Sequence, residues 1–109
     1  MQRRQGKVVI LDIYGAISMG ESKEKFVNKM DSLLMQQESN VLLNLSGINY
    51  VDSTGIGELV GYMSKFTQNN RHLKILKPHE RVKKLLNITK LDTVFEIFED
   101  EEEAVKSFQ

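Results

Sequence analysis

Three residues that can accept hydrogen bonds from backbone amides follow one another in this chain, Asp52, Ser53 and Thr54, and Gly55 comes directly after them. Each of the three can cap the N-terminus of a helix, and the glycine allows the backbone to turn tightly. One helix needs only one cap. A remaining hydroxyl, that of Ser53, could therefore be an exposed phosphate acceptor, because free N–H groups and the positive dipole end of a helix stabilise a phosphate.

A simpler interpretation is that Asp52 or Thr54 caps the helix and that Ser53 is an ordinary polar residue of the turn. Composition alone does not separate these two interpretations. Gly57 and Gly61 leave a similar choice open, because they lie four residues apart on one side of the expected helix. Their missing side chains would allow either close packing on the protein's own sheet or the close approach of a partner.

Apolar patterning places this turn between a strand and a helix. Residues 41–45 form a short apolar run, which is typical of a strand buried on both faces of a sheet. After the turn, apolar residues recur at steps of three and four, and this spacing predicts an amphipathic helix with one buried stripe. The stripe consists of Ile56, Leu59, Val60, Met63 and Phe66, and the positions predicted to face away from it are Glu58, Tyr62 and Lys65.

The rest of the chain alternates in the same way between strands and helices. The predicted strands cover residues 7–13, 41–45, 73–76 and 94–98. The predicted helices begin at a Ser22 cap, at the turn described above, at Pro78 and with the acidic turn of residues 99–103, and the first of them is predicted to end among residues 37–40. This order implies an α/β fold with a mostly parallel central sheet of four to five strands and about four helices. We expect one domain over residues 1–109.

Composition limits the classes of function. Fifteen basic and fifteen acidic residues give a formal net charge of zero, so no general attraction to nucleic acid or anionic lipid is expected. The chain has no cysteine, which excludes thiol catalysis and Cys-ligated metals and fits a reducing compartment. No apolar run approaches the ~20 residues that a membrane-spanning helix needs. We therefore expect a cytoplasmic protein with no nucleic-acid partner and no membrane partner.

Charge is nonetheless unevenly distributed along the chain. The segment 71–90 is basic, and because no aromatic residues interleave it, a solvated helix face explains it better than a nucleic-acid site. The acidic residues 99–103 would complement the dipole at the start of the last helix. His72 and His79 have no neighbouring arrangement that suggests a catalytic triad, so we do not expect an enzyme.

Much of the chain resembles the STAS family, which includes the anti-sigma factor antagonists of bacteria and related domains of sulfate transporters. The segment 50–57, Tyr-Val-Asp-Ser-Thr-Gly-Ile-Gly, carries the most specific part of this resemblance. The other segments that carry it are residues 41–48, 73–76, 82–91 and 94–97, together with Pro78. The resemblance therefore covers nearly the whole chain and implies a single STAS-like domain.

The resemblance also implies a function and a site. In the antagonist branch, the serine after the aspartate is phosphorylated by an anti-sigma factor kinase, and this serine corresponds to Ser53. The implied protein is a phosphorylation-controlled partner switch that binds the serine kinase and so releases the sigma factor, while a serine phosphatase acts on phosphorylated Ser53. Asp52, Thr54, Gly55 and Gly57 would form the switch turn and contact the partner. No cofactor and no metal are implied.

Other interpretations remain open beside this one. The chain could be a non-catalytic STAS interaction module within a larger stress-signalling or transporter-associated assembly, with or without a bound nucleotide. Neither Gly-x-x-x-x-Gly-Lys nor Gly-x-Gly-x-x-Gly occurs, so the sequence signal for a nucleotide is weak. Residues 52–55 also resemble the Asp-Thr-Gly or Asp-Ser-Gly of aspartic proteases, but they contain one extra residue and the alternating α/β order argues against an all-β protease.

The start of the chain departs from the better-known antagonists. Their first helix usually follows a Gly-x-x-Asp or Gly-x-x-Asn segment, whereas this chain has Gly15-Ala-Ile-Ser18. Ser18 can accept a hydrogen bond but carries no charge, which puts a partner contact at that position in doubt. Residues 1–5 are short for the usual opening strand, so we expect that strand to be trimmed or unpaired.

Overall fold

Three apolar strands form the centre of a five-stranded sheet in the computed structural model, which describes residues 2–36 and 40–109. The strands lie in chain order, and every pairing is parallel except that of the first two strands. The strands are β1 (Gln2–Gln5), β2 (Val8–Ile17), β3 (Asn40–Val51), β4 (Leu73–Leu76) and β5 (Ile97–Phe98). The helices are α1 (Glu21–Met35), α2 (Ser53–Gln68), α3 (Glu80–Ile88) and α4 (Glu101–Lys106), with a 3-10 turn at Leu91–Thr93. The predicted α/β class with a mostly parallel sheet is confirmed.

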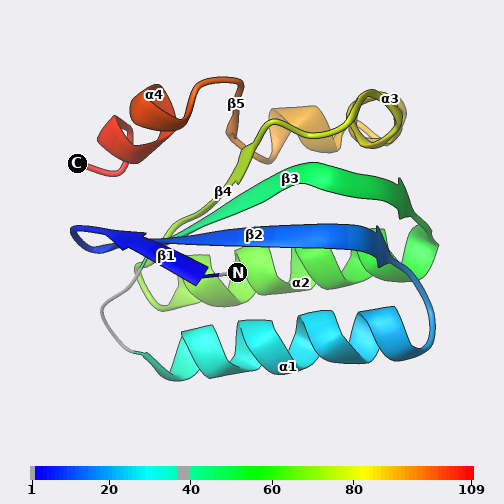
Figure 1. Cartoon of the computed structure of the whole chain (residues 1–109), viewed down its shortest axis with the longest axis horizontal. Coiled ribbons are helices and arrows are strands. Elements are labelled where there is room, and N and C mark those ends of the chain that lie inside the picture. The colour runs from blue at the N-terminus through cyan, green and yellow to red at the C-terminus, as the bar shows by residue number, and fades with distance from the viewer. Residues whose placement is uncertain (1, 37–39) are drawn as a thin grey trace.

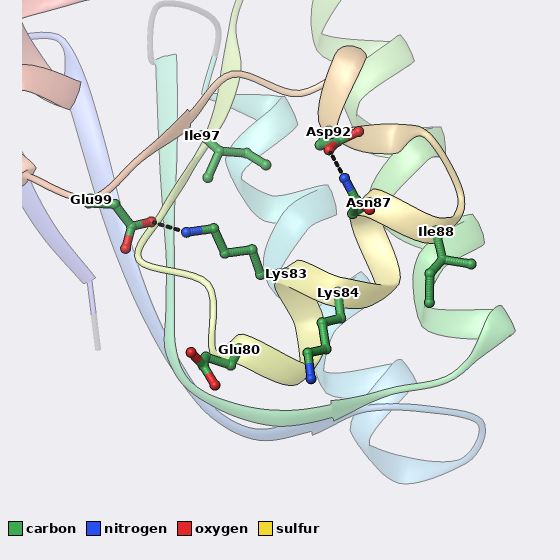
Figure 2. Close-up of a pocket in the computed structure, with 8 residues that line it drawn as sticks. All are labelled: Glu80, Lys83, Lys84, Asn87, Ile88, Asp92, Ile97 and Glu99. Carbon is green, nitrogen blue, oxygen red and sulfur yellow. Dashed lines mark hydrogen bonds and ion pairs between the residues drawn. The ribbon is translucent and has the colours of Figure 1, made fainter.

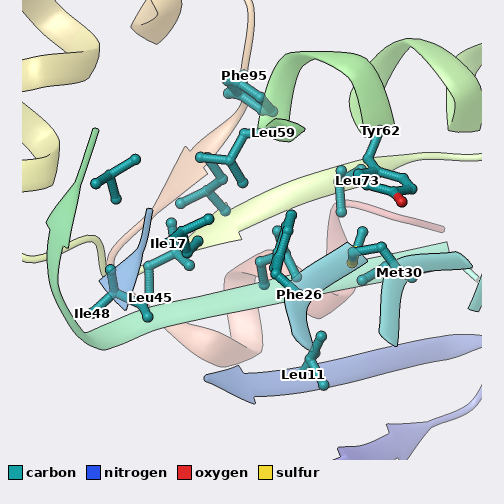
Figure 3. Close-up of a cluster of buried hydrophobic side chains, with 14 of the residues drawn as sticks. Leu11, Ile17, Phe26, Met30, Leu45, Ile48, Leu59, Tyr62, Leu73 and Phe95 are labelled. Atoms are coloured by element: carbon teal, nitrogen blue, oxygen red, sulfur yellow. The ribbon is translucent and has the colours of Figure 1, made fainter. Parts of the chain in front are cut away.

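The helices cover the two faces of the sheet. Figure 1 shows α1 and α2 together on one face, and α4 packs on the opposite face, whereas Val82 and Leu86 of α3 join the main core. The main core lies between the sheet and the first pair, where Leu11, Leu43 and Ile75 from three neighbouring strands are buried (Figure 3). A smaller core beneath α4 contains Ile10 and Leu42, which point to the opposite face because side chains alternate along a strand.

The opening segment forms a strand, contrary to our expectation. Gln2–Gln5 pairs antiparallel with Val8–Leu11 of β2, after a turn at Gly6, which has a φ of 61°. An ion-pair cluster fixes this strand, since the Arg3 guanidinium donates to Asp12 at 2.7 Å and to Glu101 at 2.8 Å. A contact between residues 98 positions apart in the chain gives no local sequence signal.

Several element boundaries differ from the sequence-based predictions. β2 continues past Ile13 to Ile17, because register shifts against β3 absorb the irregularity at this point. The last strand is only Ile97–Phe98, because the residues before it form the 3-10 turn. α3 begins at Glu80 rather than at Pro78. The first helix ends at Met35, before the predicted end among residues 37–40; Asn40 already belongs to β3, and residues 37–39 lie outside the described residues.

The Ser22 side chain does not cap α1. The helix begins at Glu21, with Gly20 at the cap position and no side-chain hydrogen bond to the first turn. Ser22 Oγ instead donates to the Ser18 carbonyl at 3.0 Å and accepts from the Ser18 backbone N–H at 3.1 Å. Ser18 therefore helps to shape the connection between β2 and α1.

One side of α2 was assigned wrongly from the sequence. Leu59 is fully buried as expected, but Tyr62 is also buried, with only 3% of its surface exposed, while Met63 is half-buried. α2 packs on the sheet and beside α1, so its buried arc is wider than one stripe. The Tyr62 ring meets Phe26 of α1 edge to face at 5.9 Å, and its hydroxyl donates to Asp31 at 2.6 Å.

The basic segment is also not simply a solvated helix face. Arg71 and Lys74 are buried. Arg71 donates to the carbonyls of Leu33 and Leu34 near the end of α1, at 2.7 and 2.8 Å. Lys74 donates to the Ser107 carbonyl at 3.0 Å. These two cations therefore tie α1 and the C-terminal segment to the sheet.

Candidate functional site

The Asp52 side chain caps α2. β3 ends at Val51, and Asp52 has an extended backbone from which its carboxylate turns back to accept from the Gly55 N–H at 2.9 Å. Its second oxygen accepts from the Met19 N–H at 3.0 Å. These two donors, Gly55 first, hold the pKa of the Asp52 carboxyl below its ordinary value. Of the two candidate caps, Asp52 and Thr54, the structure therefore uses Asp52.

With the cap supplied by Asp52, Ser53 is left as an exposed residue at the start of the helix. Among the residues that the structure describes, no hydrogen bond of the Ser53 hydroxyl is found. Thr54, the next hydroxyl, is half-buried. α2 runs for 16 residues from this point, so its N-terminal dipole and first N–H groups act at the Ser53 position.

Gly55 holds the turn tightly against β2. A Cβ atom at this position would overlap with the Ile17 carbonyl oxygen and approach the Val51 side chain to 2.9 Å. The Asp52 N–H also donates to the Ile17 carbonyl, at 3.4 Å. The ends of β2 and β3 thus fix the first turn of α2 from two sides.

Gly57 and Gly61 have no such constraint. A Cβ atom at either position would have no neighbour within 4 Å, and Gly57 is exposed. Close packing on the protein's own sheet, one of the two explanations left open by the sequence, is therefore wrong for both glycines. Gly57 lies one helical turn beyond Ser53, on accessible surface.

Large exposed side chains lie on β2, on the end of β3 and on the connection after β2, and sequence analysis missed them. Met19 is 76% exposed and lies in the connection that donates to Asp52. Tyr50, two residues before Asp52, is 55% exposed and pairs in register with Ala16 of β2. Tyr14 is 73% exposed on β2. Aromatic residues are typical of strand interiors, so their types alone did not indicate exposure.

A large cavity lies apart from this turn. It has a volume of about 600 Å³ and lies between α3 and the segment that leads through the 3-10 turn to β5 (Figure 2). Figure 2 shows Lys83 reaching toward Glu99 across this cavity, at 3.7 Å. Asn87 donates to Asp92 at 2.9 Å beside it. Lys83 and Asn87 thus engage Glu99 and Asp92, and none of the lining residues comes from the Ser53 turn.

The described ranges 2–36 and 40–109 contain neither a candidate metal site nor a candidate membrane span. No group of three or more His, Cys, Asp or Glu side chains is placed to hold a metal ion. No helix there is long and apolar enough to cross a membrane.

Comparison with known proteins defines the class to which this fold and turn belong. The family model for the STAS domain matches residues 1–104, and the chain belongs to the STAS domain family. The anti-sigma-B factor antagonist of Staphylococcus epidermidis is 35% identical over 95 residues, which cover 84% of this chain and 88% of that protein.

Two solved structures have the same fold. A crystal structure of a Thermotoga maritima protein has a TM-score of 0.91 at 23% identity, with 99% of this chain and 92% of that chain covered. The phosphorylated form of the Bacillus cell fate determinant SpoIIAA has a TM-score of 0.76 at 18% identity, with 100% and 98% covered. At these identities the structural likeness supports the fold alone.

Proposed function

We propose that this protein is an anti-sigma factor antagonist that works as a phosphorylation-controlled partner switch. Without phosphate it binds an anti-sigma factor serine kinase, which then releases its sigma factor. Phosphorylation of Ser53 ends this binding, and a serine phosphatase restores it. The relationship to the Staphylococcus epidermidis antagonist over 84% of the chain supports the class of function.

The single observation that carries the proposal is the division of roles in the turn. Asp52 supplies the helix cap, so the neighbouring Ser53 hydroxyl is exposed and has no structural task among the described contacts. A kinase can therefore reach Ser53, and a phosphate can be added without breaking the cap. The fold does not have to change for the switch to work.

Charge provides the physical mechanism of release. A phosphoserine carries about −1.5 to −2 charges and three acceptor oxygens. On Ser53 this charge stands beside the ionised Asp52 carboxylate, whose lowered pKa keeps it deprotonated. A partner that docks on the uncharged turn would then meet concentrated negative charge. Each 1.4 kcal/mol of lost interaction weakens binding by about tenfold, so a few disrupted contacts are enough.

The remaining residues of the turn have supporting roles in this proposal. Asp52 and Gly55 hold Ser53 at the start of α2 through the cap and the close contact with Ile17. Thr54 and Gly57 contribute to the surface that the partner contacts. Because Gly57 is exposed and has no side chain, a partner can come close to the helix backbone there. The protein binds and releases partners in the cytoplasm, without a cofactor and without catalysing a reaction itself.

Phosphate mapping tests the assignment of Ser53. The protein is incubated with a cognate kinase and ATP, and intact mass and peptide mapping are recorded for wild type, Ser53→Ala and Thr54→Ala. We expect one phosphate on Ser53 in the wild type and in Thr54→Ala, and none in Ser53→Ala. Phosphate found only on Thr54, or retained in Ser53→Ala, would contradict the proposal and favour a STAS interaction module that is not switched at this residue.

A further inference from the structure

The outer edge of β2 is only partly covered. β2 has ten residues, and among the described residues β1 pairs with Val8–Leu11; Figure 1 shows β1 beside the first part of β2. From Tyr14 to Ile17 the pairings given by the described residues lie on the β3 side. The register shifts in this stretch place the extra residues in β3, and Gly15 of β2 has a positive φ of 94°. Such an edge offers backbone donors and acceptors to another strand.

A groove runs along this edge between β2 and α1. It has a volume of about 300 Å³. Ile13 and Ile17 line the groove from β2, and Phe26, Lys25 and Lys29 line it from α1. Phe26 and Ile17 are buried at its base, while Lys25 is exposed and Lys29 half-buried. The groove thus combines an apolar base, an open strand edge and a basic helical wall.

The charge of the helix wall is available to a ligand. Within the described ranges no ion pair of Lys29 is found. Lys25 lies 3.4 Å from Glu21, but both side chains are more than three-quarters exposed, and such pairs contribute little. Asp12 at the other end of the groove is already engaged by Arg3 and by the Asn44 amide. The groove therefore favours a ligand that carries negative charge toward α1.

We propose that this groove binds an extended acidic segment of a partner protein, which adds a strand beside residues 13–17 of β2 and directs two carboxylates to Lys25 and Lys29. The spacing supports this geometry. Lys25 and Lys29 are four helical residues apart, which is about 6 Å along the axis, and side chains two apart on a strand are separated by about 6.6 Å. Carboxylates at alternate positions of the segment therefore match the two cations.

Side-chain alternation predicts the rest of the segment. Ile13 packs on the main core beneath the sheet, so Tyr14 and Ala16 lie on the opposite face. The residues between the carboxylates point to that face and meet Tyr14 and Ala16, so they are apolar. A second copy of this chain is disfavoured as the occupant, because two β2 edges pairing would bring two sets of Lys25 and Lys29 together. The inference goes beyond the proposed switch and does not depend on phosphate at Ser53.

Peptide selection tests this inference with the intact protein. A display library of random heptapeptides is selected on the wild-type chain, and an enriched peptide is synthesised for binding by fluorescence anisotropy and for amide mapping by NMR. We expect enriched sequences with acidic residues at alternate positions and apolar residues between them. We expect the amide shifts to fall on residues 13–17 and on the Lys25 to Lys29 part of α1.

Matched variants decide between this groove and other surfaces. The double variant Lys25→Glu and Lys29→Glu should lower the affinity for the peptide by at least about tenfold, which corresponds to 1.4 kcal/mol. Lys84→Glu makes the same type of charge change on α3 and should leave affinity unchanged. Lys29→Gln gives a milder test if the double variant loses its circular dichroism signal. A peptide with N-methylated backbone amides should also bind more weakly if it adds a strand.

Four results would overturn the inference. They are the absence of enriched peptides, enrichment without acidic residues, amide shifts on another surface, and equal affinity for wild type and Lys29→Gln. Sedimentation equilibrium addresses the competing occupant. A dimer that the Lys25→Glu and Lys29→Glu changes abolish would show that a second copy of the chain fills the groove.

Discussion

The Asp52 carboxylate accepts from the Met19 backbone N–H at 3.0 Å, across 33 positions of sequence. The same carboxylate caps α2 through the Gly55 N–H. One side chain therefore joins the connection that follows β2 to the helix that carries Ser53 at its start. The position of the proposed switch residue depends on two segments of the chain and not on the turn alone.

The first prediction concerns this double role of Asp52. Asp52→Ala removes both acceptor oxygens, so the protein should unfold at lower urea concentration than wild type, as followed by circular dichroism. Asp52→Asn keeps an acceptor for the cap and should therefore lose less stability than Asp52→Ala. Thr54→Ala is the control, because Thr54 does not supply the observed cap. Equal midpoints for Asp52→Ala and wild type would show that the cap does not stabilise the fold.

The second prediction compares two glycines in the same helix. Gly55→Ala should destabilise the protein by about 1–3 kcal/mol or more, because the added methyl group overlaps with the Ile17 carbonyl. Gly57→Ala places its methyl group in open space and should stabilise the helix by about 0.5–1 kcal/mol. Urea denaturation of both variants measures the difference. Loss of partner binding in the stable Gly57→Ala variant would assign Gly57 to the docking surface, whereas equal unfolding midpoints for the two variants would contradict the close contact between Gly55 and Ile17.

The third prediction concerns the buried arc of α2. Leu59→Ala should cost about 2–5 kcal/mol, because Leu59 is fully buried. Tyr62→Phe keeps the ring contact with Phe26 but removes the hydroxyl that donates to Asp31, and it should cost about 0.5–1.5 kcal/mol. Denaturant-induced unfolding of the two variants measures both changes in the free energy of unfolding. Partner affinity should be unchanged in Tyr62→Phe, and a selective loss of affinity would place Tyr62 at the interface instead.

The fourth prediction concerns stability at acid pH. Hydrogen bonds from the Arg3 guanidinium hold the pKa of Asp12 and that of Glu101 below their ordinary values of 3.8 and 4.5. A carboxyl group with a lowered pKa in the folded state stabilises the fold above its unfolded pKa and loses this contribution as the pH falls through the folded pKa. The free energy of unfolding should therefore decrease below about pH 5.

Substitution of Arg3 tests the origin of that pH dependence. Arg3→Gln should lower the free energy of unfolding at neutral pH. It should also make this free energy fall less steeply at acid pH, because the two carboxyl groups lose the donor that lowers their pKa. Arg4→Gln removes the neighbouring charge, whose guanidinium donates to the Gly6 carbonyl at 3.5 Å, and should keep the wild-type slope. Thermal melts at a series of pH values give the comparison. An unchanged slope in Arg3→Gln would assign the acid sensitivity to other groups.

The parts of the fold that sequence predicts well are those with local signals. The apolar run of residues 41–45 and the capping residues of the turn identified a strand, a turn and a helix, and β3 and α2 occupy these places. The strand β1 was missed because its stability comes from Arg3 contacts with Asp12 and Glu101. Burial of Tyr62 was missed because periodicity finds one stripe, whereas α2 is covered by both the sheet and α1.

The candidate site also combines features that have a local sequence signal with features that depend on distant segments. Residue types in a row left two interpretations of Ser53 open, and the resemblance to the STAS family led to its choice as the proposed switch residue. The Met19 donor, the approach of Ile17 to Gly55 and the exposed Tyr50 depend on how β2 and β3 end beside each other. Such relationships lie between segments that are far apart in sequence, so no spacing within the turn could indicate them.

The fifth prediction concerns the charge at Ser53 itself. Ser53→Asp adds a negative charge beside the Asp52 carboxylate without removing any buried surface, because Ser53 is exposed. The variant should keep the wild-type circular dichroism spectrum and bind the anti-sigma factor kinase at least about tenfold more weakly, equivalent to 1.4 kcal/mol in calorimetry. Ser53→Asn is a control of similar size without the charge, and it should bind more tightly than Ser53→Asp. An aspartate carries less charge than a phosphate, so the phosphorylated protein should bind more weakly still. If wild type, Ser53→Asp and the phosphorylated protein all bind with equal affinity, charge at this turn does not control the complex, and the chain acts as a scaffold that is not switched at Ser53.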